Sequence, residues 1–323
     1  MIVLRGDAKP GIGTGDLVSL THLALGLESI GIKTVLATQD TKEARSILHS
    51  HPHQVWYLPV QNPLDCAQSF QLACLSKKFS TIFWEITECS PNKIAYHPKF
   101  RHMGIVFEEL PPKEWEFVLC WDPLWAEKIK TQAITVNHLC GPQYVLLHPD
   151  IGLYTHPGTT KVKKVLITMG GNDEKNYSLK ILQSLRFQSL DTLSVSVICG
   201  AGYNHKTSLN SEASLWQTPP KILYNMQEIY KSFFSYDCVI SAGGLTASEL
   251  IFTKTPAILY ATVSHQMNRC QYFSDHNWCL YEKNPDLSNF AQLFSKLPDL
   301  SAADWCVNAG TMAVAHKIKA LLD

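Results

Sequence analysis

Residues 237–266, DCVISAGGLTASELIFTKTPAILYATVSHQ, contain the turn around which the fold is organised. An apolar run that ends at Ser241 predicts a β-strand, Gly243 and Gly244 predict a tight turn, and a helix is expected to open near Thr246. A second apolar strand follows. Unpaired backbone N–H groups at such a helix start suit an anion such as a diphosphate. An ordinary βαβ unit uses the same glycines only to tighten its turn, so both interpretations stay open at this point.

Length and composition indicate a globular protein with room for two domains. The chain has 323 residues, of which 46% are hydrophobic and 17% charged, and this leaves no room for a large disordered region. The formal net charge is zero, so global electrostatics favour neither nucleic acid nor an anionic membrane as a partner. No apolar run approaches the roughly 20 residues that span a bilayer, which leaves peripheral contact as the way to reach a membrane.

The cysteines and histidines predict neither disulfides nor a metal centre. Ten cysteines are spread singly, without CxxC pairs, behind a start, MIVLRGD, that does not resemble a signal peptide. This pattern predicts reduced, packed thiols in a cytoplasmic protein. His49, His51 and His53 alternate in HSHPH, where a solvated loop is favoured over metal binding because zinc-type spacing is lacking.

The first half of the chain alternates strands with helices. Apolar strands are predicted at residues 1–5, 33–37, 55–58, 80–86, 104–107 and 117–120, with helices at 17–30, 41–50 and 66–77. Strands that alternate with helices predict a parallel sheet covered on both faces, which is a Rossmann-like domain.

A glycine-rich turn joins the first strand to the first helix. Gly11, Gly13 and Gly15 allow a sharp bend, and Asp16 lies at the helix start, where a carboxylate is favourable as a cap and is also placed to act as a base. Because no Gly-Lys-Ser/Thr follows, the segment is not a P-loop, and its fit to a dinucleotide fingerprint is loose. ATP and NAD are therefore poorly supported, and no cofactor is expected.

The same plan restarts after a segment rich in Pro, Gly, Thr and Lys near residues 143–164. A strand at 164–168 runs into Gly170 and Gly171, and a helix is predicted from about 177. We therefore predict an α/β protein of two Rossmann-like domains facing a cleft, 1–150 for catalysis and the acceptor, and 151–323 for the nucleotide. The closing helix, predicted at 302–322, is a candidate to cross back to the first domain.

Motifs in this order resemble a known family. LRGD followed by GIGTGDLVSLTHLAL is similar to the pattern R-x-D…IGxGHxxRxxxLA of the pseudaminic-acid pathway UDP-sugar hydrolases, and of the SpsG-type and FlmD-type proteins. LCGPQYVLLHPDI, VLITMGGNDEKN and ISAGGLTASEL resemble later segments of that family, and the second half is more distantly similar to MurG-type N-acetylglucosaminyltransferases. The likeness is strong from about residue 140 to 271 and weak from 39 to 132.

The resemblance implies a GT-B-like enzyme that breaks the C1–O bond of a UDP-linked sugar in surface-glycan biosynthesis, such as flagellin or lipopolysaccharide glycosylation. It assigns Gly243, Gly244 and Thr246 to the diphosphate, Glu249 to the ribose, and Gln266 to the sugar or phosphates. The positions implied to hold the nucleotide sugar are Gly13, Gly15, Gly170, Gly171, Ser241, Gly243, Gly244, Thr246, Glu249 and Gln266.

Two departures from the family pattern leave three readings open. Asp16 stands where the family has the GxGH histidine, and Ser19 stands where it has arginine. Asp16 could take a proton from water in a hydrolase or from an acceptor hydroxyl in a glycosyltransferase. The third reading is a member without activity that only binds the nucleotide sugar. Neither the sugar nor the oligomeric state follows from the sequence.

Overall fold

The chain forms two compact units. The computed structural model describes residues 1–9, 13–49, 51–77, 79–132, 136–303 and 310–323. Unit 1 comprises Met1–Pro149 and Asn308–Asp323, and unit 2 comprises Asp150–Val307. In the part of the chain that the structure describes, no helix is long and apolar enough to cross a membrane. Every described cysteine is free, and all but Cys89 are buried.

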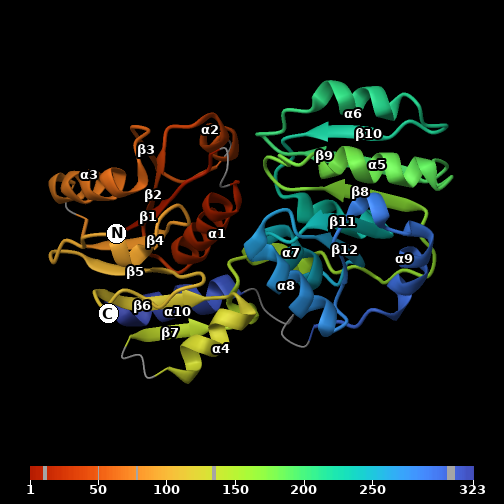
Figure 1. The fold of residues 1–323 in the computed structure, drawn as a ribbon. Helices are drawn as coiled ribbons and strands as arrows, with labels where there is room; N and C mark the ends of the chain where they lie inside the picture. Colours follow the sequence, from red (N-terminus) through yellow and green to blue (C-terminus); the bar gives the residue numbers. More distant parts are fainter. Residues whose placement is uncertain (10–12, 50, 78, 133–135, 304–309) are drawn as a thin grey trace. The chain divides into compact units, whose positions relative to one another are not determined.

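Unit 1 is built on a parallel sheet with the strand order β3-β2-β1-β4-β5-β6-β7 (Figure 1). Its strands are β1 (Ile2–Gly6), β2 (Thr34–Gln39), β3 (Val55–Leu58), β4 (Thr81–Glu85), β5 (Arg101–Ile105), β6 (Trp115–Cys120) and β7 (Asn137–Cys140). Its helices are α1 (Gly15–Ser29), α2 (Lys42–Leu48), α3 (Pro63–Ser76), α4 (Pro123–Thr131) and α10 (Gly310–Leu322). Short 3₁₀ turns occupy Pro91–Lys93 and Pro142–Tyr144, and Pro149–Leu153 where the two units meet in sequence.

Both faces of this sheet are covered, which explains why β1 is buried throughout. Adjacent strand residues point to opposite faces. The guanidinium of Arg5 reaches α3, where it lies over the ring of Phe70. On the other face, a Cβ at Gly6 would lie 2.6 Å from Leu20 of α1, so α1 packs closely against the strand.

The closing helix belongs to unit 1, where α10 packs on α1 (Figure 1). A Cβ at Gly26 of α1 would lie 2.9 Å from the methyl carbon of Thr311, so a side chain there would push the two helices apart. Thr311 Oγ1 also donates to the main-chain oxygen of Leu147 (2.5 Å). The predicted helix at 302–322 is confirmed over Gly310–Leu322, residues 302 and 303 are not helical, and residues 304–309 lie outside the described residues.

Unit 2 repeats the architecture with the order β10-β9-β8-β11-β12-β13, again all parallel. Its strands are β8 (Lys164–Thr168), β9 (Ser194–Cys199), β10 (Lys221–Tyr224), β11 (Cys238–Ala242), β12 (Ala257–Tyr260) and β13 (Leu280–Glu282). Its helices are α5 (Tyr177–Phe187), α6 (Lys206–Ala213), α7 (Leu245–Phe252), α8 (Ser264–Asp275) and α9 (Phe290–Lys296). Three 3₁₀ turns lie at Ile229–Ser235, Pro285–Leu287 and Leu297–Asp299.

Renumbered within each unit, both sheets begin with the order 3-2-1-4-5-6, the order of a Rossmann fold. The prediction of two Rossmann-like domains is therefore confirmed. In such sheets the order reverses between the first and fourth strands, and ligands bind outside the carboxyl ends of the strands at that switch point. The switch points lie between β1 and β4 in unit 1, and between β8 and β11 in unit 2.

Candidate functional site

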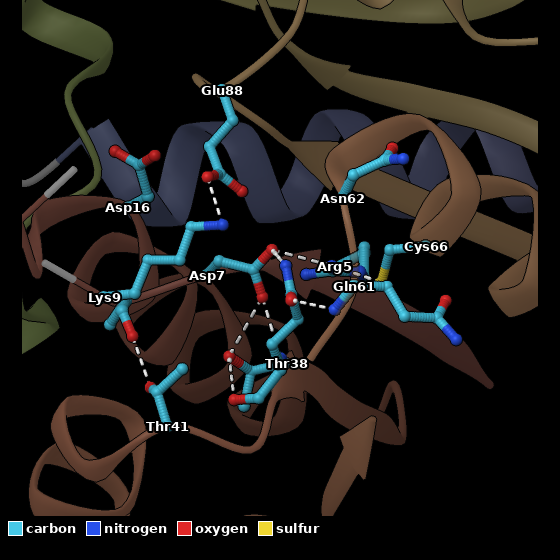
Figure 2. A network of polar contacts seen from close by, with 12 residues as sticks. Arg5, Asp7, Lys9, Asp16, Thr38, Thr41, Gln61, Asn62, Cys66 and Glu88 are labelled. Carbon is cyan, nitrogen blue, oxygen red and sulfur yellow. Dashed lines mark hydrogen bonds and ion pairs between the residues drawn. The ribbon is translucent and has the colours of Figure 1, made fainter. Parts of the chain in front are cut away.

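The carboxyl end of β1 carries a buried ion pair. Arg5 Nη2 donates to Asp7 Oδ2 (2.7 Å) and to Cys66 Sγ (3.2 Å), as Figure 2 shows. Asp7 also accepts from the main-chain nitrogen (2.7 Å) and the side-chain amide (2.9 Å) of Gln39, at the end of β2. Although burial opposes it, these donors hold the pKa of Asp7 below its usual value. Asp7 is therefore a fixed anion that ties β1 to β2.

A second ion pair joins the loop after β1 to the loop after β4. Lys9 Nζ contacts Glu88 Oε1, and both side chains are mostly buried (Figure 2). The main-chain oxygen of Lys9 also accepts a hydrogen bond from the main-chain N–H of Gly13 (3.2 Å). Gly13 has a φ of +91°, which lies in the left-handed region that favours glycine. Gly11 lies outside the described residues. The glycine-rich turn thus brings a lysine to the switch point.

Asp16 lies in the first turn of α1, beside this pair (Figure 2). Thr87 Oγ1, in the loop after β4, donates to Asp16 Oδ2 (2.6 Å). Burial raises the pKa of Asp16 to about 7, and the hydrogen bond from Thr87 opposes part of that rise. The charges of Asp7 and Glu88 raise the pKa further. Asp16 is thus a carboxyl group poised to exchange a proton near neutral pH.

Asp16 is not the cap of α1. The cap position belongs to Thr14, which makes no side-chain capping hydrogen bond, and Gly15 is the first helical residue. Ser19, one turn further on, is buried and contacts both the main-chain oxygen of Asp16 (2.9 Å) and Oε2 of Glu85 at the end of β4. His22 faces away from this cluster, since its Nδ1 lies 3.0 Å from the main-chain oxygen of Leu146.

In unit 2, the turns after β8 and β9 pack main chain against main chain. Gly170 has a φ of +79°, and Gly202 donates its N–H to the oxygen of Gly171 (2.9 Å). A Cβ at Gly200 would lie 2.5 Å from both Cα and the oxygen of Gly171, so no other residue fits there. Both glycines predicted in the GGND motif therefore shape the edge of the sheet.

The turn after β11 brings α7 and α8 together. A Cβ at Gly243 would lie 2.2 Å from Cys270 Sγ, so the close approach of α8 requires glycine. Gly244 is the cap residue of α7 and brings no side chain to the helix start. First-turn N–H groups that no cap side chain occupies are suited to an anion. Ser241, in contrast, is fully buried, and its hydroxyl donates to the main-chain oxygen of Ala242 (3.2 Å).

Glu249 is buried within α7. Burial raises its pKa to about 7, and a hydrogen bond with the side chain of Thr246 opposes the rise. The structure therefore pairs the two residues that were predicted to contact the ribose and the diphosphate separately.

The sequence suggested that Gln266 lies in a loop, but the structure places it in the first turn of α8. Its Oε1 accepts from the main-chain nitrogen and the hydroxyl of Thr262 (3.0 Å each), and its Nε2 would be 3.6 Å from a Cβ at Gly244. Arg269 Nη1, one turn later, donates to the oxygen of Gly243 (3.3 Å). Arg269 is therefore hydrogen-bonded to the glycine turn, and Gln266 lies beside that turn.

The predicted solvated loop is confirmed only in part, because His49 is exposed but the other end of the histidine cluster is not. His53 is buried, its Nδ1 lies 3.0 Å from Glu28 Oε2, and its ring stacks on that of His51. Among the residues that the structure describes, no group of three or more His, Cys, Asp or Glu side chains could hold a metal ion.

Comparisons with known proteins agree with this architecture. MurG of Acinetobacter baumannii is 13% identical with a TM-score of 0.59, and the alignment covers 99% of each chain. The spinosyn rhamnosyltransferase SpnG, complexed with thymidine diphosphate, is 12% identical with a TM-score of 0.58 over 99% of this chain and 95% of its own. The UDP co-structure of S. aureus MnaA is 9% identical with a TM-score of 0.67, over 99% and 96%. The chain has the GT-B fold.

Sequence comparison adds little to that assignment. No protein-family model matches the chain. The uncharacterised protein MJ1062 of Methanocaldococcus jannaschii is 25% identical over 129 residues, or 37% of this chain. The chain spans about a quarter (26%) of that relative.

Several residues of the candidate site in unit 1 were not predicted from the sequence. Thr87, Glu85 and Glu88 stand at or after the end of β4, while Lys9 and Gln39 stand after β1 and at the end of β2. One signal was available, because polar residues that follow an apolar strand gather at the carboxyl edge of a parallel sheet. What it could not show is that β4 pairs with β1, which brings Thr87 to Asp16 although 71 residues separate them in the sequence.

Proposed function

We propose that the protein is an enzyme that transfers a sugar from a nucleoside diphosphate to an acceptor hydroxyl. The observation that carries the proposal is Asp16, a partly buried carboxyl group with a pKa near neutrality that Thr87 holds at the switch point of unit 1. A GT-B chain whose unit 2 has a glycine-lined helix start at its own switch point supports the nucleotide side of the proposal. Likeness to a rhamnosyltransferase complexed with thymidine diphosphate supports transfer as the reaction.

In this proposal unit 2 holds the nucleoside diphosphate. The N–H groups of the first turn of α7 and the positive end of that helix face the phosphates, with Gly243 and Gly244 allowing close approach. Gly170 and Gly171 line the same edge. Glu249 accepts from the ribose hydroxyls, and Gln266 contacts the sugar or the phosphates.

Unit 1 supplies the proton acceptor. As the acceptor oxygen bonds to C1 of the sugar, its proton passes to Asp16, and the bond between C1 and the diphosphate oxygen breaks. The electron pair of that bond leaves with the nucleoside diphosphate. A carboxylate with a pKa of about 7 is matched to this task, because it is basic enough to take the proton and about half of it is ionised at neutral pH.

Hydrolysis is the second candidate, with water in place of the acceptor. It is favoured by the order of motifs that resembles the pseudaminic-acid pathway UDP-sugar hydrolases, and the UDP-linked amino sugar of that pathway is the first substrate to test. The two reactions share the donor site and the base. They differ only in whether release of the nucleotide needs an acceptor.

One assay separates the readings. Purified protein is incubated with UDP-sugars and thymidine-diphosphate sugars, and nucleotide release is followed with and without sugar acceptors. Calorimetry with UDP and thymidine diphosphate runs in parallel. Acceptor-dependent release supports transfer, and acceptor-independent release supports hydrolysis. Binding without any turnover supports the non-catalytic reading, and absence of binding to either nucleotide overturns the whole proposal.

A further inference from the structure

The end of β4 runs beneath the first turn of α1. Glu85 is the last residue of the strand, and Thr87 follows two residues later. Both side chains contact α1, Glu85 from the end of the strand and Thr87 from the loop that follows it. Thr87 contacts Asp16 directly, and Glu85 contacts Ser19. Two polar side chains of one strand end therefore hold one helical turn.

The hydrogen bond from Thr87 fixes one oxygen of Asp16. It joins Thr87 Oγ1 to Oδ2 at 2.6 Å, a length typical of a hydroxyl that donates to a carboxylate. The side chain of Asp16 is short and has only two torsion angles, so a hydrogen bond that holds Oδ2 also fixes the direction of Oδ1. Thr87 itself is exposed, and its methyl and hydroxyl groups contribute little to the core.

The contacts of the Ser19 hydroxyl favour a protonated Glu85. The Ser19 hydroxyl has one proton, yet its oxygen lies within hydrogen-bond distance of two acceptor atoms, the main-chain oxygen of Asp16 and Oε2 of Glu85. A protonated Glu85 that donates to Ser19 gives each contact its own proton, whereas an ionised Glu85 would have to share the single Ser19 proton with the main-chain oxygen of Asp16. Glu85 is 1% exposed, and burial with the neighbouring charge of Asp16 raises its pKa well above the usual value. Geometry and electrostatics thus agree on a neutral acid.

We propose that Thr87 and a protonated Glu85 are positioning residues for Asp16, Thr87 by orienting its carboxylate and Glu85 by fixing its helical turn through Ser19. The inference rests on the proposed function, in which Asp16 is the base. Oδ1 is then the oxygen that takes the proton from the acceptor. Neither positioning residue touches the reacting atoms.

The charged groups around Asp16 determine the sign of the test. Asp7 and Glu88 face it as anions, and each is paired with a cation, Arg5 and Lys9 respectively. Removing the hydroxyl of Thr87 leaves these groups in place and deletes the contact that lowers the pKa of Asp16. Since the base works in its ionised form, the acidic limb of the pH–rate profile should move to higher pH.

The first test compares Thr87→Val with Thr87→Ser. Valine keeps the shape of threonine without the hydroxyl, so we expect kcat to fall by up to about 100-fold through misplacement of the base. KM for the nucleotide sugar should hardly change. The midpoint of the acidic limb of the pH–rate profile should shift to a higher pH than the wild-type value near 7. Serine restores the hydroxyl and should restore most of the rate and the original limb. An unshifted limb in the valine variant, or no rescue by serine, overturns the role of Thr87.

The second test needs no substrate, so it stands even if the protein has no activity on nucleotide sugars. The infrared difference spectrum between wild type and Asp16→Asn reports the pH midpoint at which Asp16 titrates. The same difference, measured with Thr87→Val in both proteins, should give a higher midpoint. The spectrum of wild type minus Glu85→Gln at pH 7 should show the carbonyl band of a protonated carboxylic acid. Carboxylate bands in its place overturn the assignment of Glu85. Failure of the turnover assays with these spectra as expected would refute the proposed function alone.

Discussion

The carboxyl ends of β1 and β4 in unit 1 and those of β8 and β11 in unit 2 are equivalent places in two sheets of the same strand order, but they are built from different groups. The first edge consists of ionisable side chains, with the Arg5–Asp7 and Lys9–Glu88 pairs and the poised Asp16. The second consists mainly of main chain, with glycine turns pressed against one another and against α8. One strand order therefore carries either a row of ionisable side chains or a row of closely packed main-chain turns at its carboxyl edge.

The difference follows from what each edge is proposed to do. Main-chain N–H groups bind a diphosphate without a pKa of their own, so they hold it equally well across the neutral range. A base must change its protonation state, which requires a side chain whose environment moves its pKa towards the working pH. Asp16 and Glu249 both have a pKa of about 7 through burial, and Glu249 is thus the one ionisable exception among the residues proposed for the second edge.

Asp16→Asn tests the contrast most severely. The amide is nearly isosteric but cannot take a proton, so kcat should fall by about 10²- to 10⁴-fold, the usual contribution of a general base. Affinity for UDP should stay within about twofold, because the main-chain edge of unit 2 is untouched. Asp40→Asn is the matched control, since Asp40 is an exposed partner of Arg45. Equal loss of UDP binding in the Asp16 variant would contradict the division of roles.

Gly243→Ala tests the main-chain edge. The new Cβ would lie 2.2 Å from Cys270 Sγ, so α8 must shift, at a cost of about 1–3 kcal/mol in the free energy of unfolding. We expect UDP affinity to fall more than tenfold on the scale of about 1.4 kcal/mol per decade, as measured by calorimetry.

Two further variants control the glycine test. Gly152→Ala in the same unit meets only Phe252, at 3.8 Å, and should behave as wild type. Adding Cys270→Ala to Gly243→Ala removes the clashing sulfur and should recover part of both losses. A double variant as weak as the single one would mean that the steric explanation is wrong.

The sequence predicted the two Rossmann-like units because buried parallel strands are apolar throughout and are separated by turn glycines. The sequence did not predict helices whose buried side chains are partly polar. Helix α8 buries Gln266, Arg269, Cys270 and Phe273 at helical spacing, and two of these four are polar, so hydrophobic periodicity could not reveal it. The spacing of Met226, Ile229, Tyr230 and Phe233 predicts a helix, but the structure has a 3₁₀ turn over Ile229–Ser235. Helices α4 and α6 were not predicted.

The candidate site was predictable in unequal parts. Asp16 and the glycine turns follow directly from local sequence, because each sits where an apolar strand gives way to a helix. The contacts that define their chemistry do not. Ser19 meets Glu85 across 66 residues, and the pairing of β1 with β4 that brings them together depends on the strand order.

Glu249→Gln tests the exception on the second edge. If the carboxylate accepts from the ribose, UDP affinity should rise as the pH passes upward through about 7, where Glu249 ionises. Glutamine cannot ionise, so this rise should disappear, and affinity at pH 8 should be about three- to tenfold lower because hydrogen bonds to charged groups are stronger than neutral ones. Comparing both proteins with the same ligand cancels the titration of the UDP phosphates. Parallel curves for the two proteins would exclude a ribose contact through Glu249.

Glu85→Gln has the smallest expected effect and tests whether the first edge contains a neutral acid. The pKa of Glu85 is raised in the folded state, so its contribution to stability is complete below the pKa of about 4.3 of an unfolded glutamate and is lost as the pH rises towards the folded value. Glutamine keeps a hydrogen-bond donor for Ser19 and does not titrate. As the pH is raised from 4 to 8, the thermal midpoint of the variant should therefore increase relative to that of wild type. Each kcal/mol of difference in the free energy of unfolding corresponds to about 2–4 °C in a domain of this size. Both proteins are compared in an Asp16→Asn background, because the charge of Asp16 acts on Glu85 and its titration would not cancel in the difference. A difference in midpoint that stays constant over this range would show that Glu85 is ionised in the folded protein, and the first edge would then consist of charged groups alone.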